Sequence, residues 1–206
     1  MLGFYNYTVV LTYIGMLISF AGMIFALNGN ILAALICLMI SGVCDMFDGK
    51  IASTMERTIQ EKRFGIQIDS LSDIICFGVL PAVIVYIISN GSITGICMSG
   101  IYLLCSLIRL AYFNVDEEER QSQTQAPREF YLGLPITTAA LVLPALVGLG
   151  NIFSFPLNIV SPIALLIIAI AFITPFHLKK PTLTGKILLL LCGAAELVLL
   201  LWRVAR

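Results

Sequence analysis

Four aspartates in two closely spaced pairs are the residues of this chain best suited to chemistry. Asp45 and Asp48 are three positions apart, Asp69 and Asp73 are four apart, and all four lie inside or against apolar segments. At these spacings the two members of a pair share one face of a helix. A carboxylate in an apolar setting is costly unless a positive charge compensates it. The pattern therefore predicts a cation site.

One short polar stretch separates the two expected helices, so they are antiparallel neighbours and their aspartates can converge. Carboxylate oxygens are the ligands that Mg²⁺ and Mn²⁺ prefer, and we expect one or two divalent ions. The small residues Gly49 and Ala52 would let a bulky phosphate-bearing ligand approach the backbone. Aspartates at a membrane edge can also be helix caps or solvated residues. Four in this double spacing, together with Gly65, favour a functional site.

The composition predicts the elements that must position these residues. Of 206 residues, 59% are hydrophobic and 12% charged, and the mean hydropathy is +1.00. These values are typical of a polytopic membrane protein and exclude a water-soluble domain. We predict one all-α domain over residues 1–206, a membrane helix bundle of six or seven spans. The apolar stretches long enough to cross a hydrocarbon core of about 30 Å are Thr8–Leu27, Ile31–Ser53, Ile66–Ser89, Ile93–Val115, Leu132–Gly150, Pro156–Phe176 and Leu183–Val204.

The placement of charge predicts the orientation. The net charge is zero, which gives no sign of nucleic-acid binding. Basic residues gather in alternate loops, at Lys50–Arg63, Arg109–Arg128 and Lys179–Lys186, and such loops face the cytoplasm. The aspartate site is then expected at the cytoplasmic face of the cell membrane. Arg203 and Arg206 do not fit a seventh full span, so either the last segment does not cross completely or both are exceptions.

The aspartate pattern resembles a known signature. The order D-x-x-D-G-x-x-A, a spacer, then G-x-x-x-D-x-x-x-D is similar to that of the CDP-alcohol phosphotransferase family. Members are integral membrane enzymes that move a phosphatidyl or related group from a CDP-linked lipid to an alcohol and release CMP. Two features depart from the family: Ser53 stands where an arginine usually follows the alanine, and the spacer to Gly65 is longer than the common form. Arg57 and Arg63 are the candidates for the missing arginine's contact with the diphosphate.

The resemblance implies a role for each matched residue. Asp45, Asp48 and Asp69 would bind metal and diphosphate. Asp73 would ligate a metal and, as the last carboxylate, take the proton from the acceptor hydroxyl. The residues expected to contact the CDP-lipid are Gly49, Ala52, Gly65, Arg57 and Arg63. No paired Cys/His or Ser/His nucleophile is evident, which favours direct in-line displacement over a covalent intermediate.

Three further segments resemble the phosphatidylserine synthase branch of this family. They are D-S-L-S-D-I-I-C-F-G-V-L-P-A from Asp69 to Ala82, R-L-A-Y-F-N-V from Arg109 to Val115, and Y-L-G-L-P from Tyr131 to Pro135. The branch implies CDP-diacylglycerol and L-serine as substrates, phosphatidylserine and CMP as products, and a membrane-embedded homodimer.

Two residues in the second of these segments are candidates for the acceptor site. Arg109 is a charge within an apolar helix, which either snorkels to the interface or meets a carboxylate or phosphate through its guanidinium, a role that Arg63 could also fill. Asn114 could hold the amino acid by hydrogen bonds.

Three alternatives remain open. A glycerol 3-phosphate or inositol phosphate acceptor would need several basic residues near the site, and the sequence offers few. Intramembrane prenyltransferases also use aspartate-bound magnesium, but their aspartate clusters usually lie far apart in the sequence. A non-enzymatic cation transporter would explain buried carboxylates as an ion path. CMP release that depends on serine would separate the last alternative from the enzyme.

Overall fold

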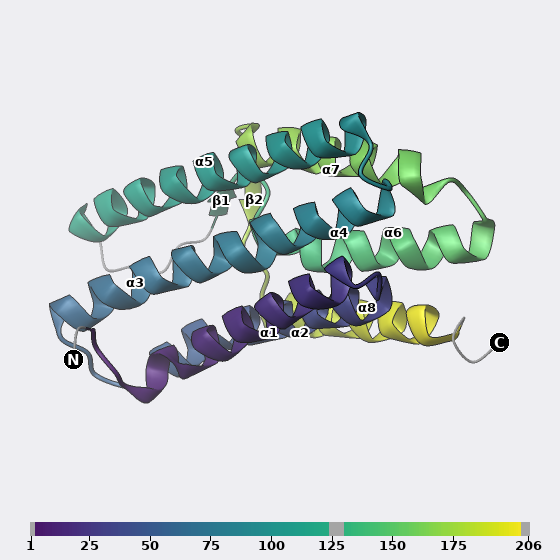
Figure 1. Cartoon of the computed structure of the whole chain (residues 1–206). Coiled ribbons are helices and arrows are strands. Elements are labelled where there is room, and N and C mark those ends of the chain that lie inside the picture. The colour runs from purple at the N-terminus through teal and green to yellow at the C-terminus, as the bar shows by residue number, and fades with distance from the viewer. Residues whose placement is uncertain (1–2, 124–129, 203–206) are drawn as a thin grey trace.

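The computed structural model describes residues 3–123 and 130–202 as a bundle of helices that run along one common direction (Figure 1). The α-helices are α1 (Val10–Leu27), α2 (Ile31–Ala52), α3 (Ile59–Asp73), α4 (Leu80–Ile88), α5 (Ile93–Gln123), α6 (Ala139–Phe153), α7 (Leu157–Ile173) and α8 (Leu183–Trp202). A π-helix, η2 (Ile74–Val79), joins α3 to α4 without a break. Short 3₁₀ turns, η1 (Tyr7–Val9) and η3 (Ile136–Thr138), precede α1 and α6.

Six helical segments in the described residues are long and apolar enough to cross a membrane. They are Tyr7–Leu27, Ile31–Ala52, Ile59–Ile88, Ile93–Arg120, Ile136–Phe153 and Thr184–Leu201. Helix α7 is apolar but shorter. In a bilayer only helices and closed barrels satisfy every backbone group internally, and this chain uses helices. The prediction of an all-α polytopic membrane bundle is confirmed.

Small residues let α1 and α2 pack closely as an antiparallel hairpin. A Cβ placed on Gly22 would meet the Cβ of Cys37 at 2.8 Å, and one on Gly15 would meet that of Cys44 at 3.2 Å. Between these two contacts the buried hydroxyls of Ser19 and Ser41 are 2.8 Å apart. Close backbone approach and interhelical hydrogen bonds hold helices together in a membrane, where hydrophobic burial cannot. This contact fixes the end of α2 that carries the first aspartate pair.

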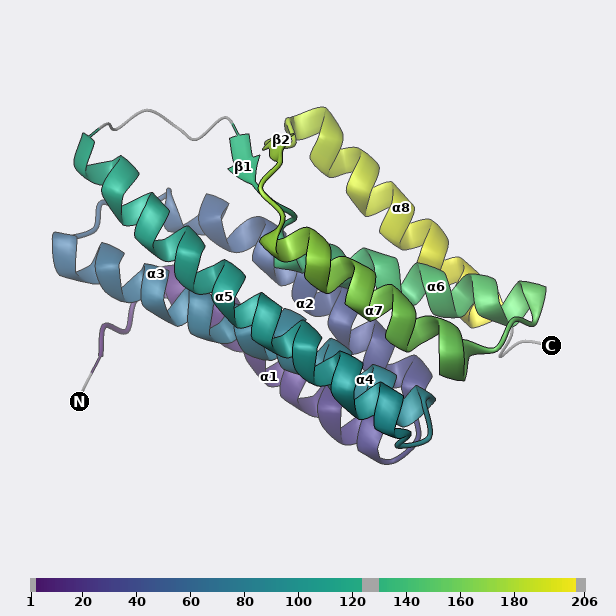
Figure 2. The same ribbon diagram turned by 90° about the horizontal axis from the view of Figure 1, so that it is seen from above.

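The core lies where α4, α5 and α7 meet α2 and α6. Its largest fully buried side chains include Tyr102, Phe77, Phe172, Leu35 and Leu38. Helix α8 lies on the outside of the bundle alongside α6 (Figure 2). Most of its apolar side chains face outward: Leu188 is 61% exposed and Leu191 is 63% exposed. Such a helix is suited to contact with lipid.

The structure corrects the predicted boundaries in three places. Helix α3 begins at Ile59 rather than Ile66, because Thr58 and Glu61 form a capping box with bonds of 2.9 and 3.2 Å. Helix α5 continues past Val115, where the predicted span ends, to Gln123. Strands β1 (Phe130–Leu132) and β2 (His177–Lys179) pair antiparallel, where no strand was predicted.

Candidate active site

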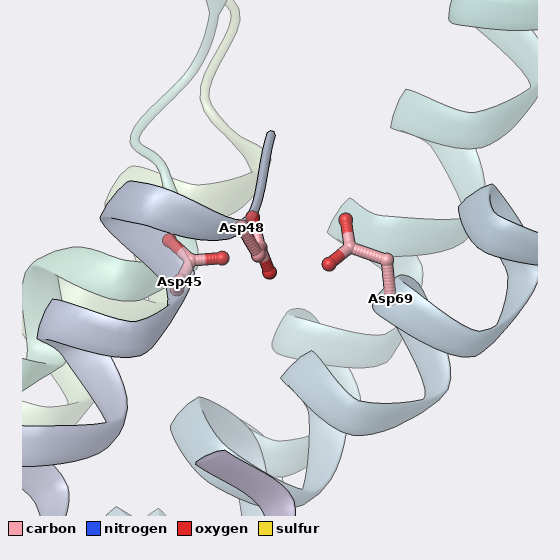
Figure 3. A group of neighbouring side chains, drawn as sticks. All are labelled: Asp45, Asp48 and Asp69. Atoms are coloured by element: carbon pink, nitrogen blue, oxygen red, sulfur yellow. The ribbon is translucent and has the colours of Figure 1, made fainter. Parts of the chain in front are cut away.

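The two aspartate pairs meet at the junction of α2 and α3. In Figure 3, Asp45 and Asp48 on the last turns of α2 lie opposite Asp69 on α3. One carboxylate oxygen from each of these three residues lies within 4.8 Å of the others. All three side chains are half-buried. The convergence expected of all four aspartates is therefore present for three of them.

Asp73 occupies a different position from the other three. It lies one turn beyond Asp69 on α3, and its carboxyl group is close enough to Asp45 to interact with it. It is not part of the group of three whose oxygens meet. The side chain expected to be a fourth ligand thus lies outside that group, next to Asp45.

The arrangement fits a divalent cation. Three carboxylates from two helices converge in a half-buried setting, where their mutual repulsion is weakly screened. A neutral hydroxyl also contacts the group: Thr12 Oγ1 on α1 donates a hydrogen bond to Asp48 Oδ2 at 3.3 Å. Oxygen-only donors of this kind suit a hard ion such as Mg²⁺ or Mn²⁺. The chemistry of the donor set therefore supports a metal site.

Lys186 is a site residue that reasoning from the sequence missed. It lies near the start of α8, is half-buried, and faces Asp45 and Asp48 closely enough to act on both electrostatically. No ion pair within 4.0 Å joins it to either carboxylate among the described residues. One ammonium group cannot offset a cluster of carboxylates, so the need for a metal remains. The sequence did carry a signal for this position. Lys186 belongs to the basic stretch Lys179–Lys186, which is predicted to lie on the same side of the membrane as the aspartates.

The two motif glycines use their lack of a side chain differently. A Cβ added to Gly49 would meet nothing within 4 Å, so the backbone next to Asp48 borders open space. A Cβ added to Gly65 would lie 3.0 Å from Nη1 of Arg57, which shows that this glycine makes room for the arginine. Ala52, one turn after Asp48, is half-buried. Gly49 leaves access to the backbone beside Asp48, and Gly65 leaves room for the Arg57 guanidinium against α3.

Arg57 and Arg63 differ in their surroundings. Arg57 lies in the turn between α2 and α3, half-buried, and its Nε is buried without a hydrogen-bond partner among the described residues. Arg63 lies on α3 and is exposed. A buried guanidinium donor without a partner is costly, and an anionic ligand would satisfy it. Of the two, Arg57 is better placed to bind a phosphate.

Asn114 reaches the site from α5. Ser70, between Asp69 and Asp73 on α3, donates from Oγ to Oδ1 of Asn114 at 2.8 Å. Because Oδ1 is the acceptor of this bond, the amide Nδ2 of Asn114 faces elsewhere as a donor. Asn114 is therefore held beside the aspartates.

Arg109 does not snorkel to the interface, because its side chain is buried with 6% exposure. Its Nε donates to the carbonyl of Leu134 at 3.2 Å, and its guanidinium lies 5.5 Å from the ring centroid of Phe113. Gly133, with φ +77°, lies against the same guanidinium. These contacts tie α5 to the segment that follows β1.

The residues before α1 cross over the α2–α3 turn, a contact that the sequence did not reveal. Tyr7 and Thr54 join their hydroxyls at 3.0 Å, and Asn6 Nδ2 donates to Glu61 Oε1 at 3.3 Å. Phe4 packs edge-on against Phe64, with ring centroids 5.6 Å apart. The segment braces the start of α3 and hence the second aspartate pair.

Comparison with known proteins gives a family match over nearly the whole chain. A family model described as CDP-alcohol phosphatidyltransferase matches residues 5–205. This range contains all four aspartates, Arg57 and Lys186, and it agrees with the resemblance carried by the aspartate motif.

Several curated relatives share part of the chain. A CDP-diacylglycerol–serine O-phosphatidyltransferase of Helicobacter pylori (strain ATCC 700392 / 26695) is 34% identical over 120 residues, which are 57% of this chain and 47% of that protein. One of Saccharomyces cerevisiae is 35% identical over 108 residues, 51% of this chain and 38% of the relative. An archaetidylserine synthase of Methanothermobacter thermautotrophicus is 35% identical over 112 residues, which are 54% of this chain and 44% of that protein. The chain spans about half the length of the curated relatives it matches.

Proposed function

The chain belongs to the CDP-alcohol phosphatidyltransferase family, and on this premise we propose that it transfers the phosphatidyl group of CDP-diacylglycerol to L-serine. The products are phosphatidylserine and CMP. The observation that carries the proposal is the convergence of Asp45, Asp48 and Asp69 beside the open backbone of Gly49. The names of the relatives support serine as the acceptor.

Asp45, Asp48 and Asp69 would hold the divalent ion, Mg²⁺ or Mn²⁺. When bound, the ion neutralises diphosphate oxygens and the charge that develops on the departing CMP. The three carboxylates would fix the place of that ion, because α1 contacts both α2 and α3 and holds the two helices in position. The small residues Gly49 and Ala52 leave room for the nucleotide along α2.

Asp73 is the proposed general base. The serine oxygen forms a bond to the phosphatidyl phosphorus, the bond from that phosphorus to the bridging oxygen breaks, and the hydroxyl proton passes to the Asp73 carboxylate. Its position next to Asp45 but outside the group of three supports this separate role. The displacement is direct and in line, since the site presents carboxylates and no activated nucleophile.

Arg57 and Lys186 are the proposed positive charges of the site. The buried, unpartnered Nε of Arg57 supports its role as the diphosphate contact that replaces the arginine absent at Ser53. Gly65 makes space for that side chain. Lys186 faces Asp45 and Asp48 and reduces their repulsion before the ion and the substrate bind.

Asn114 is the proposed contact for the acceptor, since the Ser70 bond fixes its amide beside the aspartates. Arg109 is proposed to act indirectly, because its bond to the Leu134 carbonyl holds α5, the helix of Asn114, against the segment after β1. The single domain over residues 1–206 and the homodimer complete the proposal, the latter on the family tendency.

The decisive experiment measures CMP release by the purified protein in detergent micelles that contain CDP-diacylglycerol. Parallel reactions receive L-serine, glycerol 3-phosphate, inositol phosphate or no acceptor. We expect CMP and phosphatidylserine with serine alone. If CMP is released only with another acceptor, that acceptor and not serine is the substrate. If the protein moves cations and releases no CMP, it is a transporter.

The cytoplasmic orientation of the site has its own test. A single cysteine in place of Glu118 should react with an impermeant reagent only from the cytoplasmic side of vesicles, and one in place of Ser92 only from outside. The basic loops support this orientation. Reaction of both from one side would contradict it.

A further inference from the structure

The helix that carries Asp69 and Asp73 changes its hydrogen-bond register immediately after Asp73. The Ile74 N–H still bonds to the Ser70 carbonyl, four residues back, whereas the Leu80 N–H bonds to the Ile75 carbonyl, five residues back. The π-helix η2 thus adds one residue to a turn, which rotates α3 relative to α4 by about 100° compared with an uninterrupted α-helix. Such interruptions often occur at functional sites.

Pro81 gives a physical reason for the π-helix. It lies four residues after Phe77, so in an α-helix its ring would clash with the Phe77 carbonyl, and it has no N–H to donate there. The Phe77 carbonyl instead accepts a hydrogen bond from the hydroxyl of Tyr102 on α5. Tyr102 is fully buried and packs against Phe172, with ring centroids 5.4 Å apart. A neighbouring helix therefore satisfies the group that the proline leaves free.

The rotation decides where the aspartates point. Helix α4 is fixed by side chains with no exposure, among them Leu80, Ile84 and Val85. With α4 held in this way, the direction of Asp69 and Asp73 around the helix axis depends on the register of η2. Loss of the extra residue would turn both carboxylates by about 100°, away from their present position opposite Asp45.

We propose that Tyr102 and Pro81 are positioning residues for the aspartates, because together they maintain the π-helix that turns Asp69 and Asp73 toward α2. Pro81 prevents the α-helical register, and the Tyr102 hydroxyl stabilises the register that replaces it. The inference rests on the proposed role of the aspartates in holding a metal ion.

The first test is Tyr102→Phe, which keeps the ring on Phe172 and removes only the hydroxyl. Mn²⁺ binding to the purified protein in detergent, without substrate, is measured from the electron paramagnetic resonance signal of free Mn²⁺. We expect the affinity to fall by about 10-fold, as when a group that orients metal ligands is lost. Ser161→Ala is the matched control: it removes another buried hydroxyl, bonded to the Leu157 carbonyl at 2.7 Å on α7. It should lower the melting temperature without changing Mn²⁺ affinity.

The second test is Pro81→Ala, which restores an N–H opposite the Phe77 carbonyl and so permits a continuous α-helix. This variant should fold, because alanine favours a helix more than proline does, and yet bind Mn²⁺ more weakly than the wild type. A purely structural role for Pro81 predicts unchanged affinity.

The outcomes separate this inference from the proposed function. If the wild type binds no Mn²⁺, the proposed metal site is wrong and the inference falls with it. If the wild type binds Mn²⁺ and the folded Tyr102→Phe and Pro81→Ala proteins bind it equally well, the metal site stands and the positioning role is wrong. If Tyr102→Phe does not fold, Pro81→Ala alone decides.

Discussion

The two aspartate pairs look alike in the sequence and are used differently in the fold. Both members of the pair on α2, Asp45 and Asp48, contribute oxygens to the group of three. On α3 only Asp69 does so, while Asp73 lies next to Asp45 and outside the group. A motif of four identical residues therefore need not give four equivalent ligands. We assign the pair on α2 to binding and divide the pair on α3 between binding and proton transfer.

The supports of the two pairs differ as well. The pair on α2 is held by α1, through the close Gly15 and Cys44 contact and the Thr12 hydroxyl on Asp48. The pair on α3 depends on two elements that are distant in the sequence, the segment before α1 and Asn114 on α5, and on the adjoining π-helix. Perturbations far away in the sequence should therefore act on Asp69 and Asp73 more than on Asp45 and Asp48.

Removal of the metal should have the largest effect, because it disables both pairs together. Turnover should be abolished by a chelator and return when Mg²⁺ or Mn²⁺ is added in excess, as measured by CMP release. An assay with a metal-saturated chelator is the control for direct inhibition. Full turnover in excess chelator would contradict any metal role for the aspartates.

Loss of one carboxylate from the group of three should have the next largest effect. Asp45→Asn and Asp69→Asn should weaken Mn²⁺ and CDP-diacylglycerol binding together, by roughly 100-fold or more, since loss of a group that merely supports a ligand already costs about 10- to 100-fold. Binding is measured by titration of each purified variant. If Asp69→Asn binds both as the wild type does, the site does not include α3.

Asp73→Asn should separate proton transfer from binding. Turnover should fall by about 10²- to 10⁴-fold, the usual contribution of a positioned general base, while CDP-diacylglycerol binding stays close to that of the wild type. The readouts are kcat for CMP release at saturating metal and serine, and titration of the lipid substrate. A variant with wild-type kcat would show that the proton goes to another group.

The smallest effect should come from the basic residues around α3. Arg57→Ala should raise the KM for CDP-diacylglycerol by about 10- to 100-fold, the equivalent of the ~1.5–3 kcal/mol that a hydrogen bond to a charged group contributes. Arg63→Ala removes the same charge from an exposed position on the same helical hairpin and should leave KM nearly unchanged. The reverse result would assign the diphosphate contact to Arg63.

Much of the fold followed from the sequence, because long apolar stretches and i, i+3 or i, i+4 spacings act locally. The meeting of Asp45, Asp48 and Asp69 was predictable for this reason. The start of α3 was placed too late, since its first turns are polar and the signal was the capping box at Thr58 rather than hydropathy.

The remaining features depend on contacts between residues far apart in the chain. Lys186 approaches the aspartates only because α8 packs against α2 and α6. The burial of Arg109 depends on the fold of the segment around Leu134. The π-helix breaks the period of 3.6 that any assignment of helical faces assumes, and its stabilising partner, Tyr102, lies on another helix. Local patterns carry no information on such contacts.

The pairing of β1 with β2 also constrains how the protein is assembled. Phe130 pairs with Lys179 and Leu132 with His177. The segment that contains α6 and α7 therefore lies between two paired strands, which close it into a loop. During synthesis the two strands cannot join until residue 179 has emerged from the ribosome. The α1–α2 hairpin needs only contacts between neighbouring segments and can form early. Pairing β1 with β2 closes a long loop, which costs conformational entropy, and it can happen only after both strands have been made. Completion of the fold around Leu134 is accordingly a late event in biogenesis, and a ribosome stalled before residue 177 should yield a chain that resists proteolysis at α1–α2 and is cleaved between β1 and α6.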